Sequence, residues 1–311
     1  MKRSISGRML WLACTAAAAL AAAALRRWQL RSAFEKYTGL AIPGAQASVI
    51  LTCVLVMAGA WLMILSLAGR PQSARWDHVF LSVGDPVYPA LEIAAAFFAI
   101  VSVPVLFIVG VGQFQFYQEM RAAGLQPPTD NGLLTLATAG GAFLAALGLL
   151  QTGRDSLSPG RRGRGGFSAA LPGVAGCVWL MESFRAHAAN PVRWDYAPQL
   201  LAIVLGMAFY MDFAGMSAGA ARPRRLLWMA GMTVVFSTVS LVTSASELAV
   251  RSSAGLSLCS AQLGDLLLLL SQTLAAAGVL WRLPPSLDGP SAPAGPLPDS
   301  IQEIQEDADD E

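Results

Sequence analysis

The sequence predicts an all-α protein: a polytopic transmembrane helix bundle of about eight spans, or seven if the first is cleaved. Two compositional features favour this class, since 55% of the residues are apolar and only 13% are charged. A water-soluble domain of 311 residues needs more charge to solvate its surface. The third observation is the pattern, because the long apolar segments lack the polar face of a soluble amphipathic helix.

Eight segments are candidates for the spans. A helix needs about 20 apolar residues to cross a hydrocarbon core of about 30 Å. The segments that approach or exceed this length are 9–25, 47–68, 89–111, 132–151, 167–182, 199–219, 226–246 and 259–281. They form a predicted membrane domain, residues 1–282. Residues 283–311 are rich in Pro and acidic residues, so they are expected to form a disordered cytoplasmic tail.

Two of these segments leave an alternative open. Lys2, Arg3 and Arg8 precede the first apolar segment, as in a secretory signal peptide, so this segment is either a cleaved signal or a retained first span. Segment 167–182 is the shortest and contains Pro172. It is therefore expected either to cross the membrane as a tilted or kinked helix or to re-enter the side from which it came.

The distribution of basic residues predicts the orientation. Counted over the loops on alternate sides, 13 Lys and Arg fall on the side of both termini and 8 on the other side. Cytoplasmic loops carry the excess of basic residues, so both termini are predicted to be cytoplasmic in a multi-pass plasma-membrane protein. The loop after the first span argues against this orientation, because it places Arg26, Arg27, Arg31 and Lys36 outside.

Acidic residues in the apolar segments are the candidate functional positions, because an ionisable group is costly in lipid. Asp212 lies in the sixth segment and Asp265 in the eighth, whereas Glu247, Glu182 and Glu92 lie near segment ends. In one interpretation these residues form a proton or cation path. In the other, the glutamates cap helix ends at the headgroup layer, and Asp212 pairs with Arg222, Arg224 or Arg225 or hydrogen-bonds a neighbouring helix.

No motif predicts a catalytic, cofactor-binding or metal-binding site. Residues 215–219 read Gly-Met-Ser-Ala-Gly, the pattern of a serine nucleophile, but they end a spanning segment and do not link a strand to a helix. The four cysteines lack CxxC spacing, which argues against a zinc site and a disulfide framework. An enzyme is therefore not expected.

The expected partners follow from the surface pattern. The apolar segments predict contact with the lipid bilayer. Ala137, Gly141 and Ala145 have the spacing of a small-residue face, which favours close helix packing and leaves open self-association or contact with other membrane proteins. Nucleic acid is not expected, because the basic residues gather at span ends and not on one face.

Two stretches of the sequence have a recognisable pattern. One runs from Arg-Trp-Gln-Leu at residues 27–30 to Tyr-Thr-Gly-Leu at 37–40. The other is Asn-Pro-Val-Arg-Trp-Asp-Tyr at 190–196, with Arg-Pro-Arg-Arg at 222–225. Together they resemble an uncharacterised family of multi-span membrane proteins of Gram-positive bacteria. The resemblance implies a bacterial inner membrane and carries no activity or site residues.

Two functions from different classes follow. The first is a non-enzymatic membrane component, such as an accessory, assembly or sensory protein. The alternative is a small-solute or ion permease that uses the intramembrane residues Asp212 and Asp265. A shared cavity lined by both aspartates would favour the permease, whereas separate contacts would favour the first function.

Overall fold

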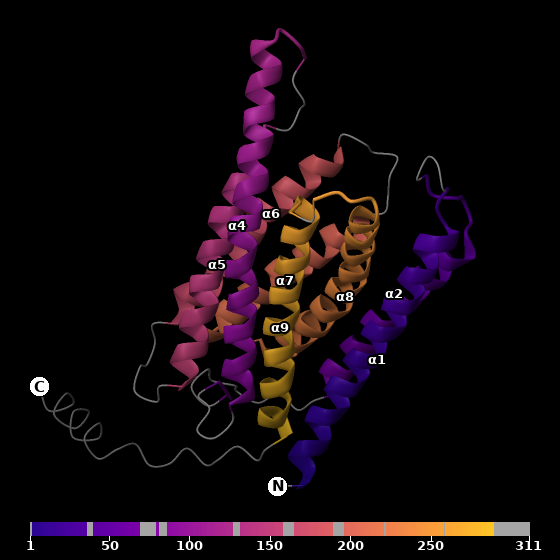
Figure 1. Ribbon diagram of the computed structural model, residues 1–311. Coiled ribbons are helices and arrows are strands. Elements are labelled where there is room, and N and C mark those ends of the chain that lie inside the picture. Colours follow the sequence, from indigo (N-terminus) through magenta and orange to yellow (C-terminus); the bar gives the residue numbers. More distant parts are fainter. Residues whose placement is uncertain are drawn as a thin grey trace, which may run out of the picture.

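The computed structural model describes residues 2–35, 40–68, 79–80, 86–126, 131–157, 165–188, 196–220, 222–257 and 259–288. Within these residues the chain forms eight helices and no strand, and every helix is long and apolar enough to cross a membrane. The predicted all-α polytopic bundle is confirmed. The helices are α1 (Lys2–Ser32), α2 (Gln46–Ala68), α4 (Val87–Ala122), α5 (Leu133–Leu157), α6 (Gly165–Ala188), α7 (Ala197–Ser217), α8 (Pro223–Ser253) and α9 (Ala261–Asp288) (Figure 1).

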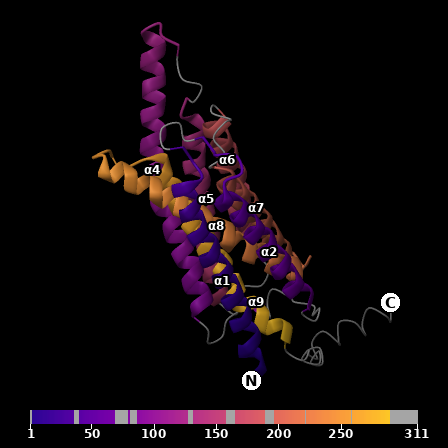
Figure 2. The same ribbon diagram turned by 90° about the vertical axis from the view of Figure 1, so that its right-hand side faces the viewer.

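Six of the helices form a closed ring. Each helix from α4 to α9 packs against the next one along the chain, and α9 packs back against α4. The hairpin of α1 and α2 lies outside this ring, where α1 contacts α8 and α9 and α2 contacts α8. Figures 1 and 2 show this hairpin, in indigo and violet, along one flank of the bundle. The interior of the ring is therefore the part of the molecule that is best shielded from lipid.

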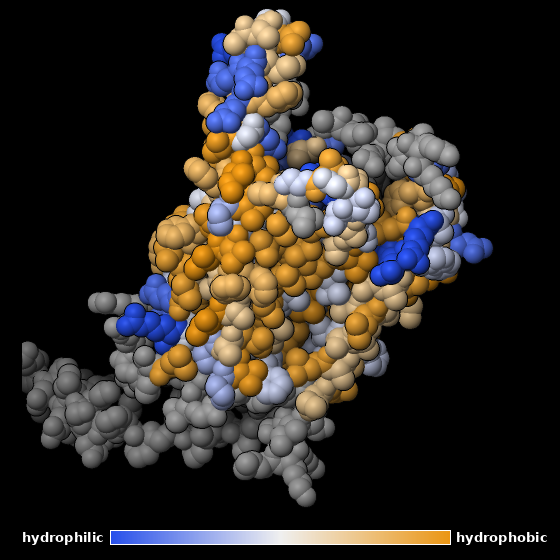
Figure 3. Space-filling model, in the orientation of Figure 1, coloured by the Kyte–Doolittle hydropathy of each residue, from blue (hydrophilic) through white to orange (hydrophobic). Residues whose placement is uncertain are grey.

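The outer surface of the bundle is apolar. On α2 alone, Val56, Met57 and Trp61 are each more than half exposed, at 66%, 70% and 54%. Figure 3 shows apolar surface over the middle of the molecule, with hydrophilic residues gathered toward its ends. A soluble monomer rarely exposes so large an apolar area. This surface is suited to contact with the hydrocarbon of a bilayer.

Several helices extend beyond the predicted segments. Helix α6 is continuous, with Pro172 inside it, and its 21-residue apolar part is long enough to span, which argues against a re-entrant segment. Helix α9 runs to Asp288, past residue 282, where the membrane domain is predicted to end. The rest of the predicted tail, residues 289–311, lies outside the described residues. Helix α4 has 36 residues, and its C-terminal end rises beyond its neighbours in Figure 1.

The predicted loop after the first span begins as a helix. Helix α1 continues to Ser32, and Arg26 within it is only 1% exposed. The Arg26 guanidinium donates to Thr243 Oγ1 of α8 at 2.9 Å and to Gln29 Oε1 at 2.6 Å. The prediction that Arg26 belongs to an outer loop is therefore wrong. These acceptors allow the charged side chain to be buried between α1 and α8.

Small residues bring α5 against α6. Gly141 lies beside Ala175, and a Cβ atom at Gly148 would collide with a backbone oxygen of α6. Ala145 is also buried, whereas Ala137 is exposed. Two of the three predicted small residues therefore face the interior of this chain, and close approach of the helices excludes larger side chains there.

Replacement of Gly148 by Ala is expected to destabilise the bundle, because the new methyl group would collide with the Ser168 backbone oxygen. Overpacking of this kind costs about 1–3 kcal/mol. Thermal unfolding of the purified variant in detergent measures the loss. Gly140→Ala is the matched control on the same helix, since nothing lies within 4 Å of a Cβ atom there. Equal unfolding temperatures for the two variants would contradict the close α5–α6 contact.

Candidate functional site

A wide cavity lies at the end of the bundle where α1, α6 and α8 finish and where α7 and α9 begin. Its volume is ≈ 660 Å³. Five helices and the residues next to them line it, with Leu30, Phe34, Glu182, Ser183, Ala186, His187, Tyr196, Gln199, Thr243, Ser244, Ser246, Glu247, Val250, Arg251, Ala261, Gln262 and Asp265. Three of the five acidic candidates, Asp265, Glu182 and Glu247, are thus brought together around one cavity. We call it the wide cavity.

Asp265 is held in place by two neutral donors. Trp179 Nε1 of α6 donates to Asp265 Oδ1 at 2.7 Å, and Gln199 Nε2 of α7 donates to Asp265 Oδ2 at 2.9 Å. Each carboxylate oxygen therefore has one partner, and each oxygen retains a lone pair for a further donor. The two bonds also tie the start of α9 to α6 and α7.

His187 forms an aromatic wall of the wide cavity. Its ring stacks on Tyr196 with centroids 4.5 Å apart. His187 Nδ1 lies 2.7 Å from the Ser183 carbonyl oxygen, which can only accept, so Nδ1 carries the hydrogen in this contact. In the neutral ring Nε2 is then an acceptor. His187 also lies near enough to Asp265 for an electrostatic interaction.

The remaining acidic lining residues differ in exposure. Glu182 is 7% exposed, and Thr135 Oγ1 of α5 lies 3.4 Å from its Oε1. Glu247 is exposed on α8. Ser183 is only 2% exposed, and its hydroxyl has no hydrogen-bond partner among the described residues. The lining of the wide cavity therefore includes both an exposed carboxylate and buried polar groups.

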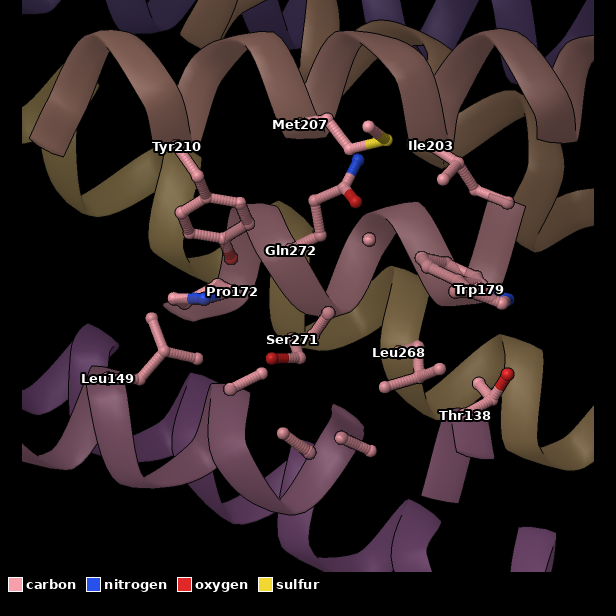
Figure 4. Close-up of a pocket in the computed structure, with 15 residues that line it drawn as sticks. Thr138, Leu149, Pro172, Trp179, Ile203, Met207, Tyr210, Leu268, Ser271 and Gln272 are labelled. Atoms are coloured by element: carbon pink, nitrogen blue, oxygen red, sulfur yellow. The ribbon is translucent and has the colours of Figure 1, made fainter. Parts of the chain in front are cut away.

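A second, much smaller void lies inside the ring. Its volume is ≈ 40 Å³, enough for about two or three water molecules. Figure 4 shows Tyr210, Met207 and Ile203 of α7 on one side of it, and the Gln272 side chain of α9 pointing toward α7. Trp179 lines this void and also donates to Asp265 of the wide cavity. The Trp179 indole therefore lies between the small void and the wide cavity.

Gln272 connects three helices beside this void. Its Nε2 donates to the Ala202 carbonyl of α7 at 2.7 Å and to Ser237 Oγ of α8 at 3.1 Å. A Cβ atom at Gly206 would collide with the Gln272 amide, so the side chain crosses α7 where that helix has no side chain of its own. At the level of Gly206, the packed Gln272 side chain therefore closes the interior of the ring.

Glu92 lies toward the other end of the ring, buried with Tyr88 on α4. Their exposed fractions are 1% and 0%. The Tyr88 hydroxyl and the Glu92 carboxylate interact with each other, and neither Glu92 Oε2 nor the hydroxyl has a hydrogen bond of good geometry among the described residues. Tyr88 packs on Phe80, with ring centroids 5.0 Å apart. The interpretation in which the glutamates cap helix ends at the headgroup layer does not describe Glu92, because this side chain is buried inside the ring.

Asp212 lies on the same side of the bundle as Glu92, far from the wide cavity. Its Oδ2 is 2.8 Å from Arg225 Nε at the start of α8. Asp212 therefore pairs with an arginine that follows its own helix, as one of the two interpretations expects. Asp212 pairs with Arg225 near the C-terminal end of α7, whereas Asp265 of α9 contacts Gln199 near the N-terminal end of α7. The two aspartates share no cavity among the described residues.

The serine motif has the geometry of a helix end. Ser217 is the last residue of α7, and its hydroxyl donates to the Ala214 carbonyl at 2.6 Å. Gly219 follows with φ +84°, a left-handed conformation that ends helices. Within the described ranges, no group of three His, Cys, Asp or Glu residues is placed to hold a metal ion.

Sequence reasoning missed most of the neighbours of the acidic residues. Trp179 and Gln199 gave no signal, because their role depends on helices that are distant in sequence. Arg26 gave a partial signal, since no Pro or Gly separates it from the apolar segment before it. An uninterrupted helix through Arg26 and Gln29 was therefore predictable, whereas the acceptor on α8 was not.

The hydrogen bond from Trp179 to Asp265 is expected to contribute to stability. Asp265→Ala should lower the free energy of unfolding by about 1–3 kcal/mol, because two donors lose their acceptor. Trp179→Phe should cost less in the Asp265→Ala background than in the wild type. A double-mutant cycle from detergent unfolding curves measures this coupling. Strictly additive losses would show that the two side chains do not interact.

The chain matches no family model, no curated protein and no solved structure. A proposal about its function therefore rests on the geometry of its own residues.

Proposed function

We propose that this chain is a non-enzymatic membrane component, sensory or accessory in type, that binds a small polar solute in the wide cavity. The observation that carries the proposal is the cavity itself, which has a volume of ≈ 660 Å³ and includes Asp265 in its lining. Ligand sites in proteins occupy about 300–1,000 Å³ and present a few fixed polar groups. Asp265 is such a group, since two hydrogen bonds hold its carboxylate.

The closed interior supports binding without transport. Past Asp265, the void inside the ring has a volume of only ≈ 40 Å³. Two side chains lie beside this void and are held in place by hydrogen bonds. Trp179 donates to Asp265 of α9, and Gln272 donates to groups of α7 and α8. A solute large enough to occupy the wide cavity cannot pass this level in the conformation described. A solute bound there instead contacts four helices of the ring and α1.

A permease is the second candidate, and Glu92 is the observation that favours it. Glu92 and Tyr88 are buried toward the end of the ring opposite the wide cavity, where their side chains interact with each other. Buried ionisable residues within spans often mark proton or ion paths. A permease of this type would use Asp265 and Glu92, because the Asp212 carboxylate is paired with Arg225.

The orientation belongs to the same proposal. The excess of basic residues on the side of both termini supports cytoplasmic termini in a plasma membrane. The burial of Arg26 weakens the main objection, because this arginine is not in a loop. With this orientation the wide cavity faces away from the cytoplasm. The bacterial inner membrane implied by the resemblance is also consistent with this arrangement.

A panel of polar solutes is expected to contain at least one that raises the unfolding temperature of the purified protein. A ligand present at 100 times its Kd stabilises the folded state by about 2.7 kcal/mol. Ser246→Trp should remove the shift, because Ser246 lines the wide cavity and an indole there occupies the ligand space. Ala245→Trp is the matched control, since Ala245 is the adjacent, exposed residue and lies outside the lining. An unchanged shift in Ser246→Trp would contradict the proposed site.

Uptake of the same solute into proteoliposomes separates the two candidates. A sensory or accessory component binds the solute without accumulating it. A permease accumulates it under an imposed ion gradient, and Glu92→Gln removes the accumulation while binding is retained.

A further inference from the structure

We propose that the wide cavity is a site for a small organic cation, whose ammonium group binds to Asp265. This inference rests on the proposed solute-binding function and adds the chemical class of the ligand. It is carried by the charge of Asp265, by the hydrogen-bonding capacity of the lining and by the stacked rings of His187 and Tyr196.

No cation is hydrogen-bonded to Asp265, although its carboxylate also interacts electrostatically with His187. Its two bonds come from an indole N–H and an amide N–H, which are both neutral donors. Neutral donors orient a carboxylate without cancelling its charge. A positively charged ligand with N–H donors would balance the charge of Asp265 and would also donate hydrogen bonds to its carboxylate oxygens. Ammonium groups have donors and no acceptor, which matches a carboxylate with free lone pairs.

Acceptors predominate among the groups around Asp265. Glu182 and Glu247 add two further carboxylates to the lining. His187 Nε2 is an acceptor in the neutral ring, because Nδ1 donates to the Ser183 carbonyl. The buried Ser183 hydroxyl has no hydrogen-bond partner among the described residues, so it is a second, independent sign of a ligand position. A carboxylate or phosphate ligand would face these oxygens with like charge.

The basic residues near the wide cavity do not oppose this assignment. Arg251 lies in the lining, but its Nε and Nη2 are 3.4 and 3.3 Å from the Ser257 carbonyl, which directs the guanidinium toward the end of its own helix. Arg26 is behind the lining residue Thr243, to which its Nε donates. Neither arginine is a hydrogen-bond partner of Asp265, whose donors are Trp179 and Gln199.

The aromatic wall supports the same ligand class. His187 and Tyr196 both line the wide cavity, and their rings stack with an interplanar angle of 23°, so each ring keeps one face that the other does not cover. Aromatic faces attract cations by about 0.5–2 kcal/mol, the larger values applying in desolvated sites. The ammonium group can come from a free amine or from an aminophospholipid headgroup, since the two share the same chemistry.

Three probes of similar shape and different charge test the inference: phenethylammonium, phenethyl alcohol and hydrocinnamate. Their affinities are measured by calorimetry on the full chain in nanodiscs made of phosphatidylglycerol alone. The cation is expected to bind at least about 10-fold more tightly than the alcohol, or about 1.4 kcal/mol, and the anion most weakly. Repetition in nanodiscs with phosphatidylethanolamine distinguishes the sources, because a headgroup ligand would compete with the soluble cation there.

Two variants make the test specific. Asp265→Asn should abolish the preference for the cation. Glu247→Gln, at an exposed position, should lower the affinity for the cation about 2–5-fold, because a partly screened charge is lost. Asp212→Asn is the control at the other end of α7 and should leave all three affinities unchanged. Tighter binding of the alcohol or the anion would overturn the cation assignment and leave the proposed solute site intact. If none of the three probes binds and Ser246→Trp changes the binding of no solute, both the cation assignment and the proposed solute site are overturned.

Discussion

Hydrocarbon offers no partner for a hydrogen bond, and this constraint organises the whole bundle. Backbone N–H groups within a span are satisfied inside their own helix, so the described spans are all helical. Hydroxyl side chains follow the same rule: Thr238, Ser240 and Ser246 of α8 each donate to the carbonyl four residues earlier. A longer polar side chain needs a partner on another helix. Gln272 finds its partners on α7 and α8, which is why it lies inside the ring and not against lipid.

The wide cavity is where this constraint is relaxed. Toward the ends of α6, α8 and α1, polar side chains face an open space and not another helix. Asp265 lies at the boundary, where its bonds to Trp179 and Gln199 join the start of α9 to α6 and α7. A ligand that binds Asp265 would therefore act on three helices of the ring at once. This arrangement links a binding event in the wide cavity to the packing of the bundle around it.

The spans could be predicted because hydropathy is a local property, and the same local rule singled out Asp265. Its partners could not be predicted, since Trp179 and Gln199 are 86 and 66 residues away in sequence and no local pattern indicates the contact. Arg26 shows the limit of the charge rule. The rule assigns a basic residue next to a span to the loop, but this arginine is buried because Thr243, 217 residues away, accepts from it.

Access of water to the wide cavity is the most direct measure of this arrangement. Ser246→Cys and Val56→Cys are made in a background without the four native cysteines and treated with a membrane-impermeant thiosulfonate. Thiolates form only where water is present, so Ser246→Cys in the wide cavity should react from one side of the membrane. Val56→Cys, whose position is 66% exposed on the lipid-facing helix α2, should react from neither side. An unreactive Ser246→Cys, or equal rates at the two positions, would contradict a water-filled cavity at one end of a membrane-spanning bundle.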